Sequence, residues 1–208
     1  MNVNRSLIRR TAALTAAGVA ALVLAACGSD SDSSAGHNGH AATSPTASAS
    51  ASRGQHNAAD IAFAQQMIPH HRQAVQMADL APSRSQSTEV KKLAAQIKKA
   101  QGPEIKTLSG WLTSWGEEVP AEGAMDHSMH GADGMMGAEE VDELERLSGK
   151  AFDTAFMEMM IKHHEGAVAM AKTEQKDGSY QPAQDMAGAI IASQSAEITQ
   201  MNQLLGRN

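Results

Sequence analysis

Two segments of the chain, 60–115 and 153–208, repeat each other without a gap, and each carries a Met-Ile-x-His-His motif. Each residue of the first copy has its counterpart 93 positions later, as Met67 has in Met160. The identical pairs run through the whole repeat: Asp60 and Asp153, Phe63 and Phe156, His70 and His163, Ala94 and Ala187, Gln101 and Gln194, Leu112 and Leu205. A match of this length indicates an internal duplication, so one fold must serve both copies.

Each copy has the sequence pattern of two helices joined by a short turn. In the first copy, apolar residues recur at helical spacing over 63–80 and again over 90–112. Turn formers interrupt the pattern at Ala81-Pro82-Ser83 in the first copy and at Lys176-Asp177-Gly178 in the second. A short helical lead-in over 141–147 precedes the second copy. Two hairpins with apolar stripes bury them against each other, which predicts an all-α four-helix bundle.

The first 26 residues resemble a bacterial lipoprotein signal peptide. Three arginines precede an apolar run over 12–26, which is shorter than a membrane span and ends in Leu24-Ala25-Ala26-Cys27. In this lipobox pattern the chain is cut before Cys27, whose thiol then carries a lipid. We therefore expect a lipid-anchored protein on the extracytoplasmic face of the cell membrane. A plain secretory leader with a chance cysteine is the alternative.

Cys27 is the only cysteine of the chain, and the formal net charge is −6. A lipidated Cys27 leaves the folded part without a thiol, which excludes disulfides and cysteine-ligated zinc or iron–sulfur sites. An acidic protein is a poor partner for nucleic acid and a suitable one for cations. Soft-metal chemistry in this protein must therefore use its 13 methionines and 9 histidines.

Two segments lack the pattern of a packed core. Residues 27–56, rich in Ser, Ala and Gly, are predicted to form a flexible tether ahead of a folded domain over 57–208. In that domain, a loop over 116–138 connects the hairpins 57–115 and 139–208. Thioether and imidazole groups suit copper, above all Cu(I). The loop supplies four candidate ligands: Met125, His127, Met129 and His130. A loop of accidental composition is the alternative.

The repeated motif places methionine and histidine on one helix face. Residues three and four apart are neighbours on a helix, so Met67 lies beside His70 and His71. Adjacent side chains on a helix diverge by about 100°. One histidine of each pair is therefore expected to face the bundle axis, and the other a seam between helices or the solvent. The candidate metal ligands are Met67, His70, His71, Met77, Met160, His163, His164 and Met170.

A comparison with di-iron carboxylate bundles makes the choice of metal sharper. Those bundles carry Glu-x-x-His on two helices and a glutamate on each of the other two. This chain has Met67 and Met160 in place of the glutamates of the two motifs, and it has Glu104 and Glu197 at matched points of the other helices. Thioethers in place of carboxylates shift the preference from iron towards copper. The two glutamates are placed to orient a histidine through its second nitrogen.

Longer motifs surround the histidine pairs. They read Phe63-x3-Met67-Ile68-Pro69-His70-His71-x3-Val75-x-Met77-Ala78 and Phe152-Asp153-x2-Phe156-x3-Met160-Ile161-x-His163-His164-x-Gly166-Ala167-x2-Met170-Ala171. With these motifs the chain resembles the bacterial "domain of unknown function 305" family over about residues 57–208. The resemblance implies a ferritin-like four-helix bundle, often exported, with some members linked to copper binding and copper tolerance. The copies differ after the histidines, where Arg72-Gln73 stands against Glu165-Gly166.

Three functions stay open at this point. The first is a lipid-anchored protein that sequesters copper or buffers Cu(I) outside the membrane. The second is a ferritin-like metal-dependent oxidase, and the third is an envelope module without metal, in which the histidines are structural. The sequence carries no triad, phosphate-binding loop or activated nucleophile, so nothing in it demands catalysis.

Overall fold

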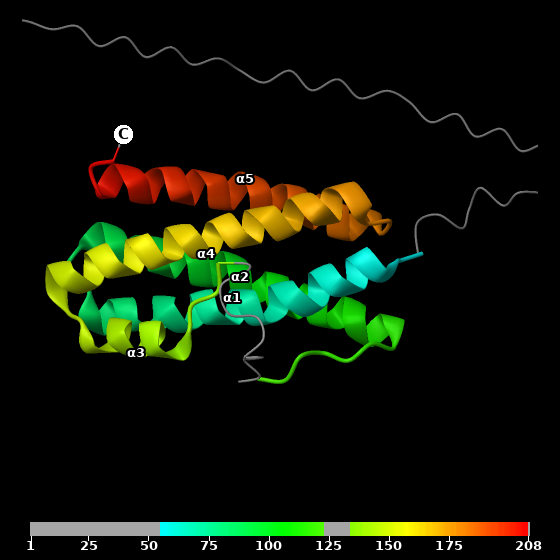
Figure 1. Ribbon diagram of the computed structural model, residues 1–208, viewed down its shortest axis with the longest axis horizontal. Helices are drawn as coiled ribbons and strands as arrows, with labels where there is room; N and C mark the ends of the chain where they lie inside the picture. The colour runs from blue at the N-terminus through cyan, green and yellow to red at the C-terminus, as the bar shows by residue number, and fades with distance from the viewer. Residues whose placement is uncertain (1–54, 123–133, 208) are drawn as a thin grey trace, which may run out of the picture. The chain divides into compact units, whose positions relative to one another are not determined.

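The computed structural model describes residues 55–122 and 134–207, which form five α-helices and no β-strand (Figure 1). The helices are α1 (Ala58–Arg84), α2 (Thr88–Trp115), α3 (Ala138–Arg146), α4 (Gly149–Asp177) and α5 (Gln181–Leu204). The all-α bundle predicted from the duplication is therefore confirmed, together with the short lead-in helix before the second copy. The predicted signal peptide, Cys27 and most of the predicted tether lie outside the described residues.

Each copy folds as an antiparallel hairpin, α1 with α2 and α4 with α5, and the two hairpins join mainly through α1 and α4 (Figure 1). The short helix α3 packs on both members of this central pair. The helices α1 and α4 run in opposite directions, so the two copies are related approximately by a twofold rotation (Figure 1). Corresponding residues of the copies therefore face each other only near the rotation axis, at the middle of the α1–α4 seam, as His70 and His163 do.

The first turn comes later than the sequence predicted. We expected a break at Ala81-Pro82-Ser83, but α1 continues through Pro82 to Arg84. The proline ring fixes a backbone angle near the helical value, so the chain can remain helical through Pro82 at the cost of one backbone hydrogen bond. The helix ends where the N–H of Ser85 donates to the carbonyl of Ala81, and Ser87 then caps α2.

Asp60 and Asp153 occupy the same position in the two copies, and each fastens the turn of the other hairpin. The carboxylate of Asp60 accepts hydrogen bonds from the backbone N–H groups of Ser179 at 3.1 Å and Tyr180 at 3.0 Å. Asp153 accepts one from the hydroxyl of Ser85 and one from the N–H of Ser87, the latter at 3.1 Å. Both carboxylates are buried. The duplication therefore uses one contact twice to hold the hairpins together at both ends.

The core consists of two apolar clusters with the histidine pairs between them. One cluster takes residues 74–81 of α1 and 152–161 of α4, and the other takes 63–68 of α1 and 167–171 of α4. On each helix the two histidines fall between these ranges. The bundle therefore places four imidazoles in one layer at the middle of its length.

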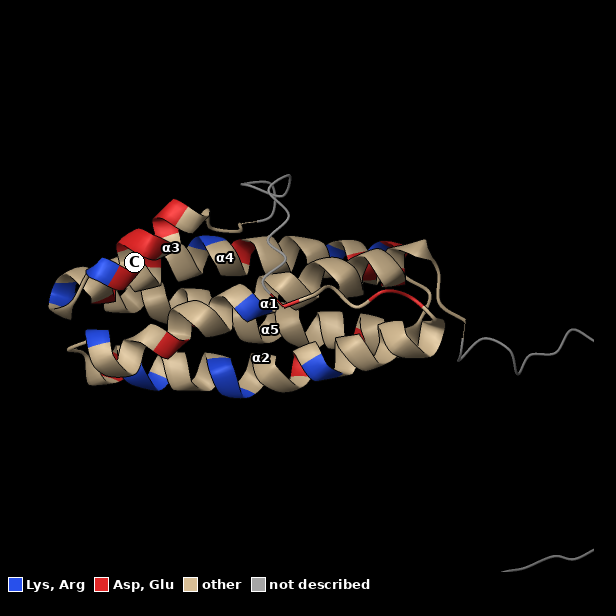
Figure 2. Ribbon diagram, turned by 90° about the horizontal axis from the view of Figure 1, so that it is seen from below, with Lys and Arg blue, Asp and Glu red and all other residues tan. Residues whose placement is uncertain are grey.

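Charged residues are distributed along the helices, and acidic residues gather on α3 (Figure 2). Among the described helices, none combines the length and the apolar character that a membrane span requires.

Candidate metal centre

The four histidines of the repeated motifs form one buried layer, with His70 exposed by 1% and His71, His163 and His164 by 0%. The rings of His70 and His163 lie against each other across the α1–α4 seam, with centroids 3.7 Å apart and planes inclined by 39°. The ring centroids of His70 and His71 are 6.5 Å apart, and those of His163 and His164 are 6.3 Å apart. We call His70 and His163 the inner pair and His71 and His164 the outer pair. This matches the expectation that one histidine of each motif faces the axis.

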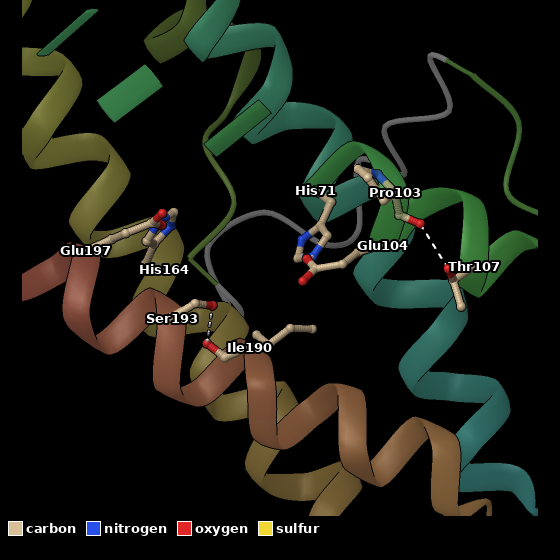
Figure 3. Close-up of polar contacts among 8 residues, drawn as sticks. All are labelled: His71, Pro103, Glu104, Thr107, His164, Ile190, Ser193 and Glu197. Atoms are coloured by element: carbon tan, nitrogen blue, oxygen red, sulfur yellow. Dashed lines mark hydrogen bonds and ion pairs between the residues drawn. The ribbon is translucent and has the colours of Figure 1, made fainter. Parts of the chain in front are cut away.

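Each outer histidine points to a glutamate on the second helix of its own hairpin. The Nε2 atom of His71 lies 2.8 Å from Oε2 of Glu104, and Nε2 of His164 lies 2.6 Å from Oε2 of Glu197 (Figure 3). An ionised carboxylate only accepts hydrogen bonds, so Nε2 carries the proton. In the neutral ring, Nδ1 then has a free lone pair, and Nδ1 of both outer histidines is buried without a hydrogen-bond partner. Carboxylates orient metal-ligating histidines through this same contact.

His163 of the inner pair is held in its neutral form. Burial lowers the pKa of His163 well below its ordinary value, and the charges of His70, His164 and His71 lower it further. A backbone hydrogen bond with His70 raises the pKa of His163, but by less than burial and the neighbouring charges lower it. A neutral imidazole with a free lone pair is the form of histidine that ligates metals. The layer thus contains ring nitrogens, such as Nδ1 of His71 and of His164, whose lone pairs are free to bind a metal.

Methionines flank the histidine layer on both sides. Met67 and Met170 belong to one core cluster, and Met77 and Met160 belong to the other. All four are buried, Met170 the least at 8%. Because α1 and α4 are antiparallel, each side of the layer receives one motif methionine from each helix. All eight of these residues are candidate ligands by sequence, and the fold brings them to the middle part of the bundle.

The layer lacks the donor set of a carboxylate-rich metal site. Within residues 55–122 and 134–207, no three or more His, Cys, Asp or Glu side chains are grouped so that they could hold a metal ion. A metal at this layer must therefore draw on the methionine sulfurs, which fits the replacement of the di-iron glutamates by Met67 and Met160. The assignment of these residues as ligands stays a prediction.

Four other candidate ligands, Met125, His127, Met129 and His130, lie outside the described residues, so their role stays a prediction. The structure does describe both ends of the segment that contains them.

Arg72 and Gln73 hold the two ends of this connection. The sequence showed them only as positions at which the two copies differ. Arg72 donates to the carbonyls of Pro120 at 2.7 Å and Ala121 at 3.1 Å. The side-chain amide of Gln73 donates to the carbonyl of Met136 and accepts from its N–H, both at 2.8 Å. The sequence feature that could have indicated this role is the difference between Arg72-Gln73 and Glu165-Gly166 at matching positions of the two copies.

Solved structures resemble this chain over the bundle. A DUF305 protein from Streptomyces coelicolor has 32% sequence identity and a TM-score of 0.64, covering 71% of this chain and 91% of its own. A DUF305 fragment from Deinococcus radiodurans has 30% identity and a TM-score of 0.65, covering 73% of this chain and 98% of its own. CopM in its Cu(I)-bound form has 34% identity and a TM-score of 0.59, covering 70% of this chain and 94% of its own.

CopM has also been solved with Cu(II) bound and with Ag bound. No curated protein sequence matches the chain. The family model named "Domain of unknown function (DUF305)" matches residues 60–205, which includes both copies of the repeat and the segment between them. The chain therefore belongs to the DUF305 family.

Proposed function

We propose that this protein binds copper, preferentially as Cu(I), in the histidine layer and thereby sequesters it. The observation that carries the proposal is the layer itself, in which buried imidazole nitrogens without hydrogen-bond partners lie between pairs of buried methionines. His70 and His163 would act with Met67, Met77, Met160 and Met170 as ligands. The outer pair would add ligands oriented by Glu104 and Glu197.

The donor chemistry favours a soft ion. Thioethers bind Cu(I) well and bind hard ions such as Mg²⁺ or Ca²⁺ poorly, while imidazole accepts either oxidation state of copper. The similarity to CopM, which binds Cu(I), Cu(II) and Ag, supports the same class of ligand here.

We also propose that the binding takes place outside the cytoplasm, on a protein anchored to the membrane by a lipid on Cys27. This part rests on the lipobox pattern of residues 24–27. A surface-anchored binding protein with buried soft donors would hold copper that arrives at the cell envelope.

The test is a competition titration of the purified protein with Cu(I) against a chromophoric chelator. We expect the variant with His70, His71, His163 and His164 all changed to Ala to lose the tightest site. Circular dichroism shows whether this variant keeps its helices, and the single change His163→Gln serves as a milder variant. The matched control is His56→Ala, because His56 stacks on Trp115 outside the layer, with ring centroids 4.4 Å apart. Unchanged Cu(I) binding in folded histidine variants would refute the site.

Two further measurements separate the competing functions. A variant without residues 116–138 shows how much binding belongs to the connection. Oxygen uptake during Cu(I) or Fe(II) addition would identify a metal-dependent oxidase, whereas passive binding consumes none. A protein that binds no copper and keeps its melting temperature when copper is added would be the metal-free envelope module.

A further inference from the structure

The two copies of the hairpin diverge where the connection between them docks. Gln73 and Gly166 occupy the same position of the repeat. Gln73 holds the backbone of Met136 through two hydrogen bonds of 2.8 Å, and both residues are buried. Gly166 on α4 faces Gly134, where an added Cβ would lie 3.3 Å from the Cα of Gly166. One copy thus supplies an amide that holds the connection, and the other supplies the space for it.

The docked segment, which we call the strap, consists of residues 134–137. Gly134 has a φ of 74°, and a Cβ there would lie 2.3 Å from the carbonyl oxygen of Lys162, so only glycine fits. The strap therefore touches α1 at Gln73 and α4 at Lys162 and Gly166. Gln73 is one turn from His70, and Gly166 is one turn from His163. The strap crosses the α1–α4 seam beside the histidine layer.

This docking buries the side chain of Met136, which is exposed by only 4% and belongs to the same core cluster as Met77 and Met160. The cluster on the other side of the layer includes Met67 and Met170 but no residue of the strap. The repeated motifs supply methionines only in matched pairs, Met67 with Met160 and Met77 with Met170. Met136 adds a methionine from outside the repeat, and its hydrogen bonds to Gln73 hold its backbone beside a residue that is one turn from His70.

We propose that Met136 is a third thioether ligand for a soft monovalent cation, acting with Met77 and Met160 on one side of the histidine layer. The proposal rests on the proposed function and deepens it by naming a ligand outside the repeated motifs. Thioether sulfur prefers Cu(I) and similar soft ions. Gln73 is then a positioning residue, since it fixes the backbone of Met136 without touching the ion. The two sides of the layer are unequal, and the side with three thioethers binds more tightly.

The test is titration of the purified protein with Ag(I), which is a redox-inert substitute for Cu(I), and with Cu(I) itself. The variant is Met136→Leu, a volume-conserving change that protein cores tolerate well. The matched control is Met157→Leu, because Met157 is exposed by 5% and lies in the same cluster. Met157 lines the cavity beside Lys150 and Arg207 at the end of the bundle.

We expect Met136→Leu to weaken the tightest site by about tenfold or more, since even residues that only orient a ligand change metal affinity by about 10–100-fold. X-ray absorption of the Cu(I)-loaded protein should show one sulfur ligand fewer. Met157→Leu should leave both measurements unchanged. Gln73→Ala, which releases the strap and keeps all thioethers, should weaken binding in the same direction and provides a second variant if Met136→Leu does not fold.

Three results would overturn the proposal. Equal affinity and equal sulfur number in Met136→Leu and wild type would make Met136 a core residue only, while loss of binding in the histidine variants would still support the proposed function. Equal weakening by Met136→Leu and Met157→Leu would indicate a general loosening of the core. A wild-type protein that binds neither Ag(I) nor Cu(I) would refute both this proposal and the proposed function.

Discussion

A carboxyl pair at one end of the bundle makes the stability of this protein depend on pH. Glu174 on α4 is exposed by 1% and faces Asp60 of α1. Burial, together with the interaction with the side chain of Asp60 and the charge of Asp60, raises the pKa of Glu174 to about 8. Burial opposes ionisation of Asp60 as well, but its hydrogen bonds to Glu174, Asn57, Tyr180 and Ser179 outweigh this and lower its pKa. At neutral pH, Glu174 therefore holds a proton and carries no charge beside the carboxylate of Asp60.

The sign of the effect follows from the two states of Glu174. Its carboxyl group has an ordinary pKa of 4.5, and the folded protein raises this to about 8. The folded state therefore binds the proton more tightly than the unfolded state. The resulting stabilisation is complete below pH 4.5 and is lost as the pH rises through 8. At 1.36 kcal/mol for each pH unit, the free energy of unfolding should fall by about 3–4 kcal/mol between pH 5 and pH 8. The lowered pKa of Asp60 acts below pH 4, outside this window.

The perturbation is Glu174→Gln, which keeps a neutral hydrogen-bond donor at the same place and cannot titrate. Urea unfolding of the metal-free protein, followed by circular dichroism from pH 5 to pH 9, measures the free energy of unfolding. We expect wild type to lose about 3–4 kcal/mol more than Glu174→Gln between pH 5 and pH 8. Glu165→Gln is the control, because Glu165 is exposed on the same helix. Parallel pH curves for wild type and Glu174→Gln would refute the reasoning.

Two further predictions concern the metal centre and the anchor. Glu104→Gln and Glu197→Gln, which remove the carboxylates from His71 and His164, should lower Cu(I) affinity by about 10–100-fold and keep the stoichiometry. Competition with a chelator measures both quantities, and an unchanged affinity would contradict the orienting role of the glutamates. Cys27→Ser should move the protein out of the membrane fraction of the producing cells, as followed by fractionation and immunoblotting, and an unchanged membrane fraction would contradict the lipid anchor.

The duplication made the two helical hairpins and the inward direction of one histidine in each motif predictable. It left open whether the motif helices run parallel or antiparallel, and the structure shows the antiparallel arrangement in which His70 and His163 lie 3.7 Å apart between centroids. The matched Glu104 and Glu197 could likewise be placed next to the outer histidines. Helical periodicity does not fix the last residue of a helix, so the turn after Pro82 was placed too early. The helix end depends on the hydrogen bonds of Ser85 and Asp153, which come from distant parts of the chain.

The contacts that break the symmetry could not be read from the pattern. Gln73 reaches Met136 across 63 residues, and nothing in the local sequence of either residue indicates the other. The burial of Glu174 could not be predicted either. The first copy has Ala81 at the same position, and a charged residue on a helix is normally predicted to be exposed to solvent. Only tertiary packing decides such positions. What the sequence could offer was the list of positions at which the copies differ.

The histidine layer destabilises the folded state, because buried polar atoms in it have no hydrogen-bond partners. Nδ1 of His71 and Nδ1 of His164 are buried without hydrogen-bond partners. Each unsatisfied polar atom costs about 1–3 kcal/mol, a large share of the roughly 5–15 kcal/mol by which a domain is stable. Apolar side chains of similar volume would fill the same space at lower cost. A soft cation that accepted the free lone pairs among these atoms would offset part of the cost, so metal binding at this layer would be coupled to folding stability. Because the layer lies between the two apolar clusters, that coupling would act on the middle of the bundle rather than on one end.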